Sequence, residues 1–199
     1  VTFFRRSVFI SGMVFKRSSA AACSSERFDG TLLYQQHLVG RILAKESGVY
    51  LNSILTYHRL GGVPDFGASA AEQGLFVPKQ QTPDSSVNFM RGMIAIAKSL
   101  DEARRPKVSH LILRDIGNYS YPILSIQSDR SLGIFLSYIR QLMQLGLWRA
   151  PLFYMYALGL IVFRRRNCDR FIARIKATLG RAPLLGRVYA GNSLNGRSD

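Results

Sequence analysis

The sequence is poor in acidic side chains. Only 12 Asp and Glu residues stand against 27 Lys and Arg, which gives a formal net charge of +15 at pH 7. Such an excess indicates a polyanionic partner, either RNA or an anionic lipid surface. The mean hydropathy of +0.04 is high for an RNA-binding protein of this charge. A chain that is both apolar and basic therefore favours lipid.

Cysteine and histidine are scarce as well. The two cysteines, Cys23 and Cys168, lie far apart and outside any CxxC pair, which argues against a disulfide framework and a zinc site. No two of the three histidines, His37, His58 and His110, share one helix face at metal-ligand spacing. Walker loops, dinucleotide fingerprints and zinc signatures are also missing. The sequence thus predicts neither an enzyme nor a bound cofactor or metal.

The length of 199 residues and the apolar share of 47% fit one domain with appendages. Apolar residues recur mostly at helical spacing, which predicts a mainly α fold of several amphipathic helices with extended N- and C-terminal tails. We divide the chain into a basic transit-like arm (1–26), a helical soluble or peripheral region (27–130) with a connector (61–83), a membrane-associated helical region (131–180) and a basic tail (181–199).

The N-terminal arm is VTFFRRSVFISGMVFKRSSAAACSSE. It carries Arg5, Arg6, Lys16 and Arg17, has no acid before Glu26 and is rich in Ser, Ala and Phe. This composition is typical of a mitochondrial transit peptide. Free tails of this kind are normally disordered, and such an arm becomes ordered when a partner surface holds it. We expect a partner surface to hold this arm.

Apolar periodicity and helix-boundary residues predict the helices that follow. The connector between the second and third of them is rich in Pro and Gly. VSHLILRDI, within Lys107–Ile116, alternates too little to choose between a strand and a helical turn, and Gly117–Pro122 reads as a turn. The predicted helices are Phe28–Glu46, Val49–Leu60, Asp84–Arg105, Ser131–Leu147 and Leu152–Leu179.

The most apolar stretch is LWRAPLFYMYALGLIVFRRR, Leu147–Arg166. Its uncharged part, Leu152–Phe163, is twelve residues long, whereas a membrane span needs about 20. Starting at Leu145 gives nineteen residues, interrupted by Arg149 and Pro151. We predict a membrane helix over 147–163, either transmembrane or re-entrant, that runs on into a basic amphipathic helix; a buried core helix is the alternative.

Basic residues crowd the end of this stretch. Between Ser131 and Leu194 the only acid is Asp169, against ten Lys or Arg. Basic pockets at headgroup depth bind cardiolipin, and the guanidinium of Arg pairs with two phosphate oxygens at once. A plain topology signal is the alternative. The candidate lipid-binding residues are Arg164, Arg165, Arg166, Arg170 and Arg174, together with Trp148 and Arg149 near the start of the stretch.

These features predict a structural role and a location. We expect an accessory subunit of a mitochondrial inner-membrane complex, either ATP synthase or a respiratory-chain complex, whose partners are other subunits and an anionic lipid such as cardiolipin. The alternative is a mitochondrial ribosomal protein whose basic tails neutralise the phosphates of rRNA. The aromatic residues favour the first, because they cluster in the apolar stretch and do not alternate with the arginines.

Overall fold

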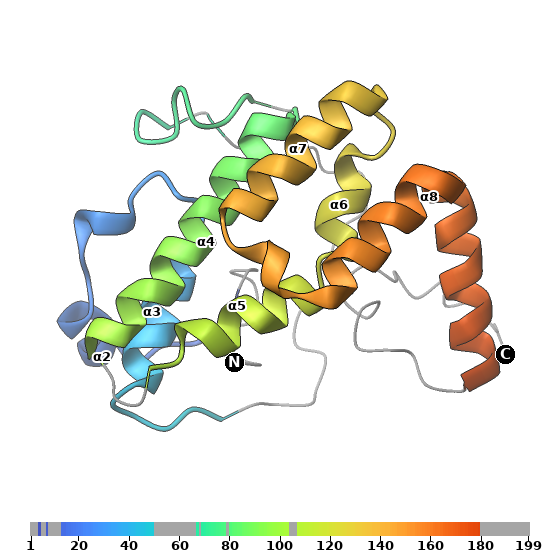
Figure 1. Ribbon diagram of the computed structural model, residues 1–199. Helices are drawn as coiled ribbons and strands as arrows, with labels where there is room; N and C mark the ends of the chain where they lie inside the picture. The colour runs from blue at the N-terminus through green and yellow to red at the C-terminus, as the bar shows by residue number, and fades with distance from the viewer. Residues whose placement is uncertain are drawn as a thin grey trace, which may run out of the picture.

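The computed structural model describes residues 4, 7, 13–49, 67, 69–78, 80–103 and 107–179. Within these residues the chain forms seven α-helices and two short 3-10 helices, and it contains no strand (Figure 1). The predicted, mainly α fold is therefore confirmed. The predicted tail at 181–199 and nearly all of the helix expected at Val49–Leu60 lie outside the described residues.

The first described elements are α2 (Arg17–Ala22), the 3-10 helix η1 (Glu26–Phe28) and α3 (Tyr34–Leu43). The helix predicted from Phe28 begins only at Tyr34. Gly30 and Leu32 adopt positive φ angles of 77° and 61°, which a helix cannot include. A side chain at Gly30 would also meet the carbonyl oxygen of Ala71. A tight turn therefore replaces the first two predicted helical turns.

Helix α4 (Pro83–Ala103) is the centre of the fold and packs against α3, α5 and α7 (Figure 1). It matches the predicted Asp84–Arg105 as far as the structure describes it. The predicted apolar face is buried, as its spacing required. Gly92 lies in close contact with Thr31, whose Cβ is 3.0 Å from the position of an added Cβ. The buried residues of the predicted face are Val87, Met90, Ile94 and Ala97, and Met93, Ile96 and Leu100 of the same helix are buried as well.

Three helices follow: α5 (Ser109–Asn118), α6 (Tyr121–Gln127) and α7 (Leu132–Gln144). The undecided VSHLILRDI segment is helical. The predicted Gly117–Pro122 turn is shorter than expected, because α6 begins at Tyr121 with Pro122 in its first turn. Helix α7 agrees with the prediction and buries Phe135, Ile139 and Leu142, although Leu132 is exposed.

The chain ends, as far as it is described, with the 3-10 helix η2 (Leu147–Arg149) and α8 (Pro151–Leu179). Helix α8 bends sharply at Arg164, whose φ of 58° and ψ of 162° are not helical (Figure 1). It consists of a first half, residues 151–163, and a second half, residues 165–179. Contacts with α5, α6 and η2 attach α8 to the rest of the fold.

The predicted transmembrane helix over 147–163 is wrong. No helix in the described part of the chain is long and apolar enough to cross a membrane. Gly146, with a φ of 103°, and η2 separate α7 from α8. The straight segment that remains, residues 151–163, is about 20 Å long, whereas the hydrocarbon core of a bilayer is about 30 Å thick.

Candidate functional site on the last helix

The first half of α8 is apolar on all sides but is covered on only one. Phe153, Ala157 and Leu160 are buried in the core. Five large side chains on the opposite side are between 37% and 63% exposed, and their spacing places them on one helix face. A helix that is apolar all round is normally buried. We call Tyr154, Met155, Leu158, Ile161 and Val162 the outward apolar face.

The exposed apolar side chains of this face adjoin one another. Single exposed apolar residues are common, but a contiguous apolar patch usually marks a site for a protein, membrane or ligand partner. Leu158 lies at the centre of the face and is its most exposed member. The surrounding chain leaves these side chains open to a partner.

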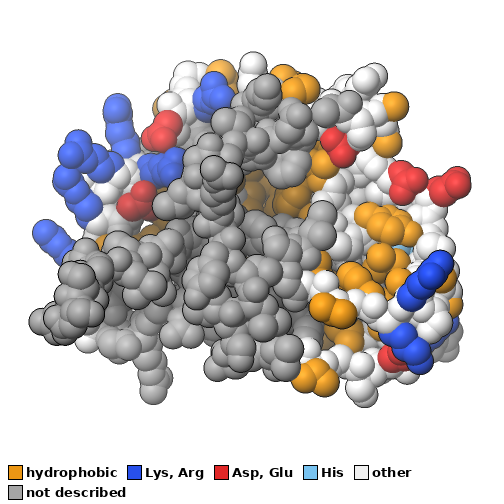
Figure 2. Space-filling view, turned by 180° about the vertical axis from the view of Figure 1, so that it is seen from behind, with side chains coloured by type: hydrophobic (Ala, Val, Ile, Leu, Met, Phe, Trp, Pro, Cys, Tyr) orange, Lys and Arg blue, Asp and Glu red, His pale blue; other side chains and the backbone are white. Residues whose placement is uncertain are grey.

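The second half of α8 carries a row of arginines. Arg166, Arg170 and Arg174 are spaced by four residues, so they follow one side of the helix over about 12 Å. All three are exposed, and none forms an ion pair within the part of the chain that the structure describes. Figure 2 shows Lys and Arg side chains gathered along the edge of the molecule where α8 lies. We call these three residues the arginine row.

Unpaired arginines at this spacing repel one another. Like charges four residues apart destabilise a helix by roughly 0.2–0.5 kcal/mol per pair. An anionic partner removes this repulsion and gains charge-assisted hydrogen bonds. The row therefore has the electrostatic character of a phosphate- or carboxylate-binding surface.

Arg165 lies apart from the row and contacts the body of the protein. Its guanidinium is 3.5 Å from a carboxylate oxygen of Asp129 and 3.7 Å from one of Asp169. The Tyr121 hydroxyl donates a hydrogen bond of 2.6 Å to Asp169, and burial together with this contact raises the pKa of Tyr121. These groups fasten the start of the second half to α6.

Arg164 is the residue at which α8 bends. Its backbone angles fall in a region that is essentially reserved for glycine and costs other residues about 1–3 kcal/mol. The side chain is exposed. Its role in the described structure is thus to separate the outward apolar face from the arginine row.

Trp148 and Arg149 lie at the other end of the first half, in η2. Both are exposed, and the Arg149 guanidinium carbon is 5.1 Å from the Trp148 ring centroid, a cation–π contact. The first half of α8 lies between them and the arginines, so the structure does not gather all seven predicted residues in one place. It assembles the arginine row and places Arg164, Arg165 and the Trp148–Arg149 pair elsewhere.

The sequence does not reveal the outward apolar face as a surface, because an uncharged run of this length fits the interior of a membrane or of a protein core. Nor does it single out Phe171, which is 65% exposed beside the arginine row. One feature of the sequence does point to this face. Twelve consecutive apolar residues place apolar side chains all round the helix, whereas a helix with one buried face needs them on one side only.

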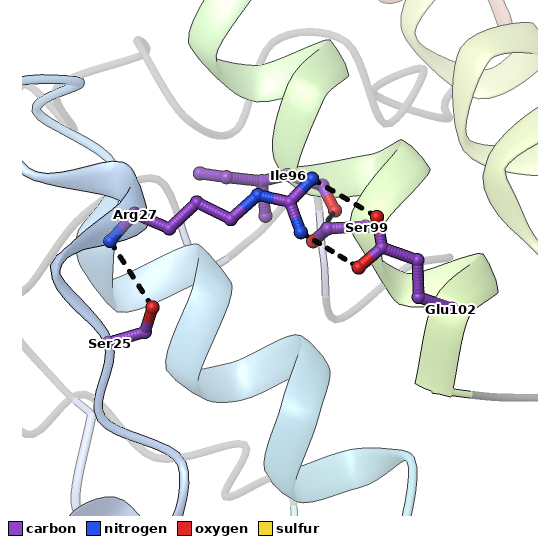
Figure 3. A network of polar contacts seen from close by, with 5 residues as sticks. All are labelled: Ser25, Arg27, Ile96, Ser99 and Glu102. Carbon is purple, nitrogen blue, oxygen red and sulfur yellow. Dashed lines mark hydrogen bonds and ion pairs between the residues drawn. The ribbon is translucent and has the colours of Figure 1, made fainter.

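A second candidate is a polar hollow of about 180 Å³ between the N-terminal segment, α3 and α4. On one side, Arg27 and Glu102 form a bidentate pair with N–O distances of 2.7 and 3.1 Å (Figure 3). The hydrogen bond from Arg27 lowers the pKa of Glu102. The pair ties η1 to the end of α4, so these two charges are already used within the fold.

His37 also lines this hollow. Its Nε2 donates to the carbonyl oxygen of Cys23 at 3.2 Å, and its ring lies 4.8 Å from that of Phe28. Burial lowers the pKa of His37, so the ring is neutral at pH 7. No group of three His, Cys, Asp or Glu that could hold a metal occurs among the described residues. His37 therefore serves to position the N-terminal segment.

Comparisons with known proteins found no family model, no curated protein and no solved structure that matches this chain. Its function is accordingly inferred from the two surfaces of α8.

Proposed function

We propose that this chain is a structural accessory subunit of a mitochondrial inner-membrane complex, either ATP synthase or a respiratory-chain complex. Catalysis resides in other subunits. The observation that carries the proposal is the exposure of two surfaces on α8, the outward apolar face and the arginine row. The transit-like composition of residues 1–26 supports the mitochondrial location.

The outward apolar face supports attachment to a larger assembly. Burying apolar surface contributes about 25 cal/mol per Å², and an exposed apolar patch of this kind is typical of a site where a protein attaches to a membrane or to a partner. Tyr154 and Met155 lie beside Leu158 on this face. We propose other subunits as partners of the chain and an anionic lipid such as cardiolipin as the partner of the arginines.

The ribosomal alternative uses the same charge but leaves the outward apolar face without a role. RNA binding depends on contacts to phosphates and on stacking of bases. The exposed Met155, Leu158 and Val162 offer neither kind of contact. The accessory subunit accounts for both surfaces of α8 and is the function that we favour.

Depletion of the chain from mitochondria tests this function. We expect less assembled complex on native gels, with an unchanged catalytic rate per complex that remains, because the chain supports assembly and not chemistry. Re-expression of the wild-type chain should restore the amount. Loss of mitochondrial translation before any loss of assembled complex would favour the ribosomal protein instead.

A further inference from the structure

We infer that α8 lies along the surface of an anionic bilayer, with its outward apolar face among the upper acyl chains and its arginine row on lipid phosphates. This inference rests on the proposed function and names the lipid as a direct partner. It differs from a membrane span, because both halves of the bent helix lie parallel to the membrane plane.

The first half of α8 is covered by the fold on one side, and its other side is apolar and open, as the buried side of an interfacial helix is. Such helices bury one apolar face about 5–10 Å into the boundary between headgroups and acyl chains. Leu158 is at the centre of the outward apolar face, with Met155 and Val162 beside it. Trp148, exposed just before the helix, belongs to the residue type that concentrates at headgroup level.

The arginine row supplies the electrostatic part. A guanidinium pairs with two phosphate oxygens through parallel hydrogen bonds, and a basic residue near an anionic surface strengthens binding by about fivefold. Arg166, Arg170 and Arg174 have no acidic partner in the described structure, so binding breaks no internal ion pair.

The two acids near the row already have partners within the fold. Asp169 accepts a hydrogen bond from Tyr121 and lies near Arg165, and Asp129 faces the same arginine. Arg165 thus offsets part of their negative charge within the fold. Phe171 and Ile175, both exposed, add apolar surface to the second half, which gives it the amphipathic character of a membrane-surface helix.

Apolar and basic surfaces on one helix favour lipid over RNA. An anionic bilayer offers phosphates and hydrocarbon in adjacent layers, whereas RNA offers phosphates without a hydrocarbon phase. The arginine row can bind the phosphate groups of a lipid or those of RNA. The binding of the same variants to a single-stranded RNA is therefore measured beside the flotation experiment described next.

Flotation of the purified full-length chain with vesicles tests the inference. The vesicles consist of phosphatidylcholine alone, with cardiolipin, or with phosphatidylserine at equal total charge. The basic variant changes Arg166, Arg170 and Arg174 to Gln, and the apolar variant changes Met155 and Leu158 to Ser. Matched controls change three exposed basic residues elsewhere, Lys98, Arg114 and Arg140, to Gln, and the exposed Leu136 to Ser.

We expect binding to both kinds of anionic vesicle and little binding to phosphatidylcholine. Both α8 variants should lower the partition coefficient about tenfold or more, and the controls should change it less than about threefold. A preference for cardiolipin at equal charge indicates recognition of its two phosphates, and equal binding indicates a general anionic surface. A triple Arg→Lys variant keeps the charge and should retain most of the binding.

Two results would overturn the inference. One is wild-type protein that does not bind anionic vesicles; the other is a basic variant that loses RNA binding while vesicle binding stays intact. Far-ultraviolet circular dichroism confirms that each variant is folded. If the chain joins a membrane complex but binds no vesicle, this inference alone fails, and if it binds vesicles but joins no complex, the proposed function alone fails.

Discussion

Arg164 has the most strained backbone of the residues that the structure describes within a helix. Glycine adopts a φ of 58° without a steric cost but loses more entropy on folding. We predict that Arg164→Gly raises the free energy of unfolding by about 1 kcal/mol, the difference between these two effects. Urea unfolding followed by circular dichroism measures the change.

Arg164→Ala is the control for this prediction. Alanine removes the same side chain but keeps the Cβ that causes the strain, so we expect no comparable gain. If α8 were a straight helix, the glycine variant would lose about 1 kcal/mol relative to the alanine variant. The sign of the difference between the two variants therefore tests the bend.

Asp101 fixes the start of α5 from the end of α4. Its Oδ1 accepts hydrogen bonds from the backbone N–H groups of Val108 and Ser109 at 2.7 and 3.0 Å. Burial raises the pKa of Asp101, but the bonds from Ser109 and Val108 outweigh it, and the net pKa is lowered. A carboxyl with a lowered folded-state pKa stabilises the fold above its ordinary pKa of about 3.9 and loses this effect as the pH falls.

Asp101→Ala should therefore cost about 1 kcal/mol at pH 7, the usual loss of a capping side chain, and clearly less at pH 3. Glu46→Ala, at an exposed position, serves as the control. Unfolding free energies at the two pH values give the comparison. An equal loss at both would show that the carboxylate charge is not what holds α5.

At the scale of elements, several described residues of the N-terminal arm contact the folded core. Phe4 is buried in the core cluster, and its carbonyl oxygen accepts a 2.9 Å hydrogen bond from the side chain of Gln36. Further along, the Tyr34 hydroxyl accepts a bond from the backbone of Ser25, and Arg27 pairs with Glu102. Described residues of an arm with the composition of a targeting signal thus pack against α3 and α4.

We predict that Phe4→Ala lowers the free energy of unfolding by about 3–5 kcal/mol, as other buried phenylalanines do. Val14→Ala, at a position that is 95% exposed, should change it by less than about 0.5 kcal/mol. We also expect mass spectrometry of the chain from mitochondria to find Phe4 retained. Phe4→Ala with wild-type stability would contradict the packing of this segment.

Periodicity predicted the elements whose burial follows from local pattern. Helix α4 has a proline at its start and one clear apolar face, so its position and its buried side were both predictable. The start of α3 was not, because Leu32 adopts a positive φ that leucine normally avoids. The bend in α8 was not predictable either, because arginine is a good helix former and gives no sign of a break at position 164.

The candidate site was predicted only in part. The sequence identifies the apolar run and the basic residues after it, but not which of them the rest of the fold covers. Phe153 and Leu160 are buried in the core, whereas Leu158 is exposed. Arg165 forms an ion pair with Asp129, which lies 36 positions earlier in the chain. Such choices depend on tertiary contacts, which periodicity does not encode.

At the scale of the whole molecule, the chain combines a packed helical body with a helix that is half covered. Its excess of 15 positive charges favours an anionic environment. Salt should therefore weaken vesicle binding, because surface electrostatics are screened beyond about 8 Å at physiological ionic strength. The outward apolar face adds a contribution that salt does not screen.

The central claim is that α8 attaches this chain to an inner-membrane complex. Its most direct test is native-gel separation of mitochondria that express either the wild-type chain or the Met155→Ser, Leu158→Ser variant, with Leu136→Ser as the control. The account predicts that the wild-type and control chains migrate with ATP synthase or a respiratory-chain complex and that most of the double variant is released. A double variant that migrates with such a complex as the wild type does, or a wild-type chain that sediments with ribosomes, would contradict it.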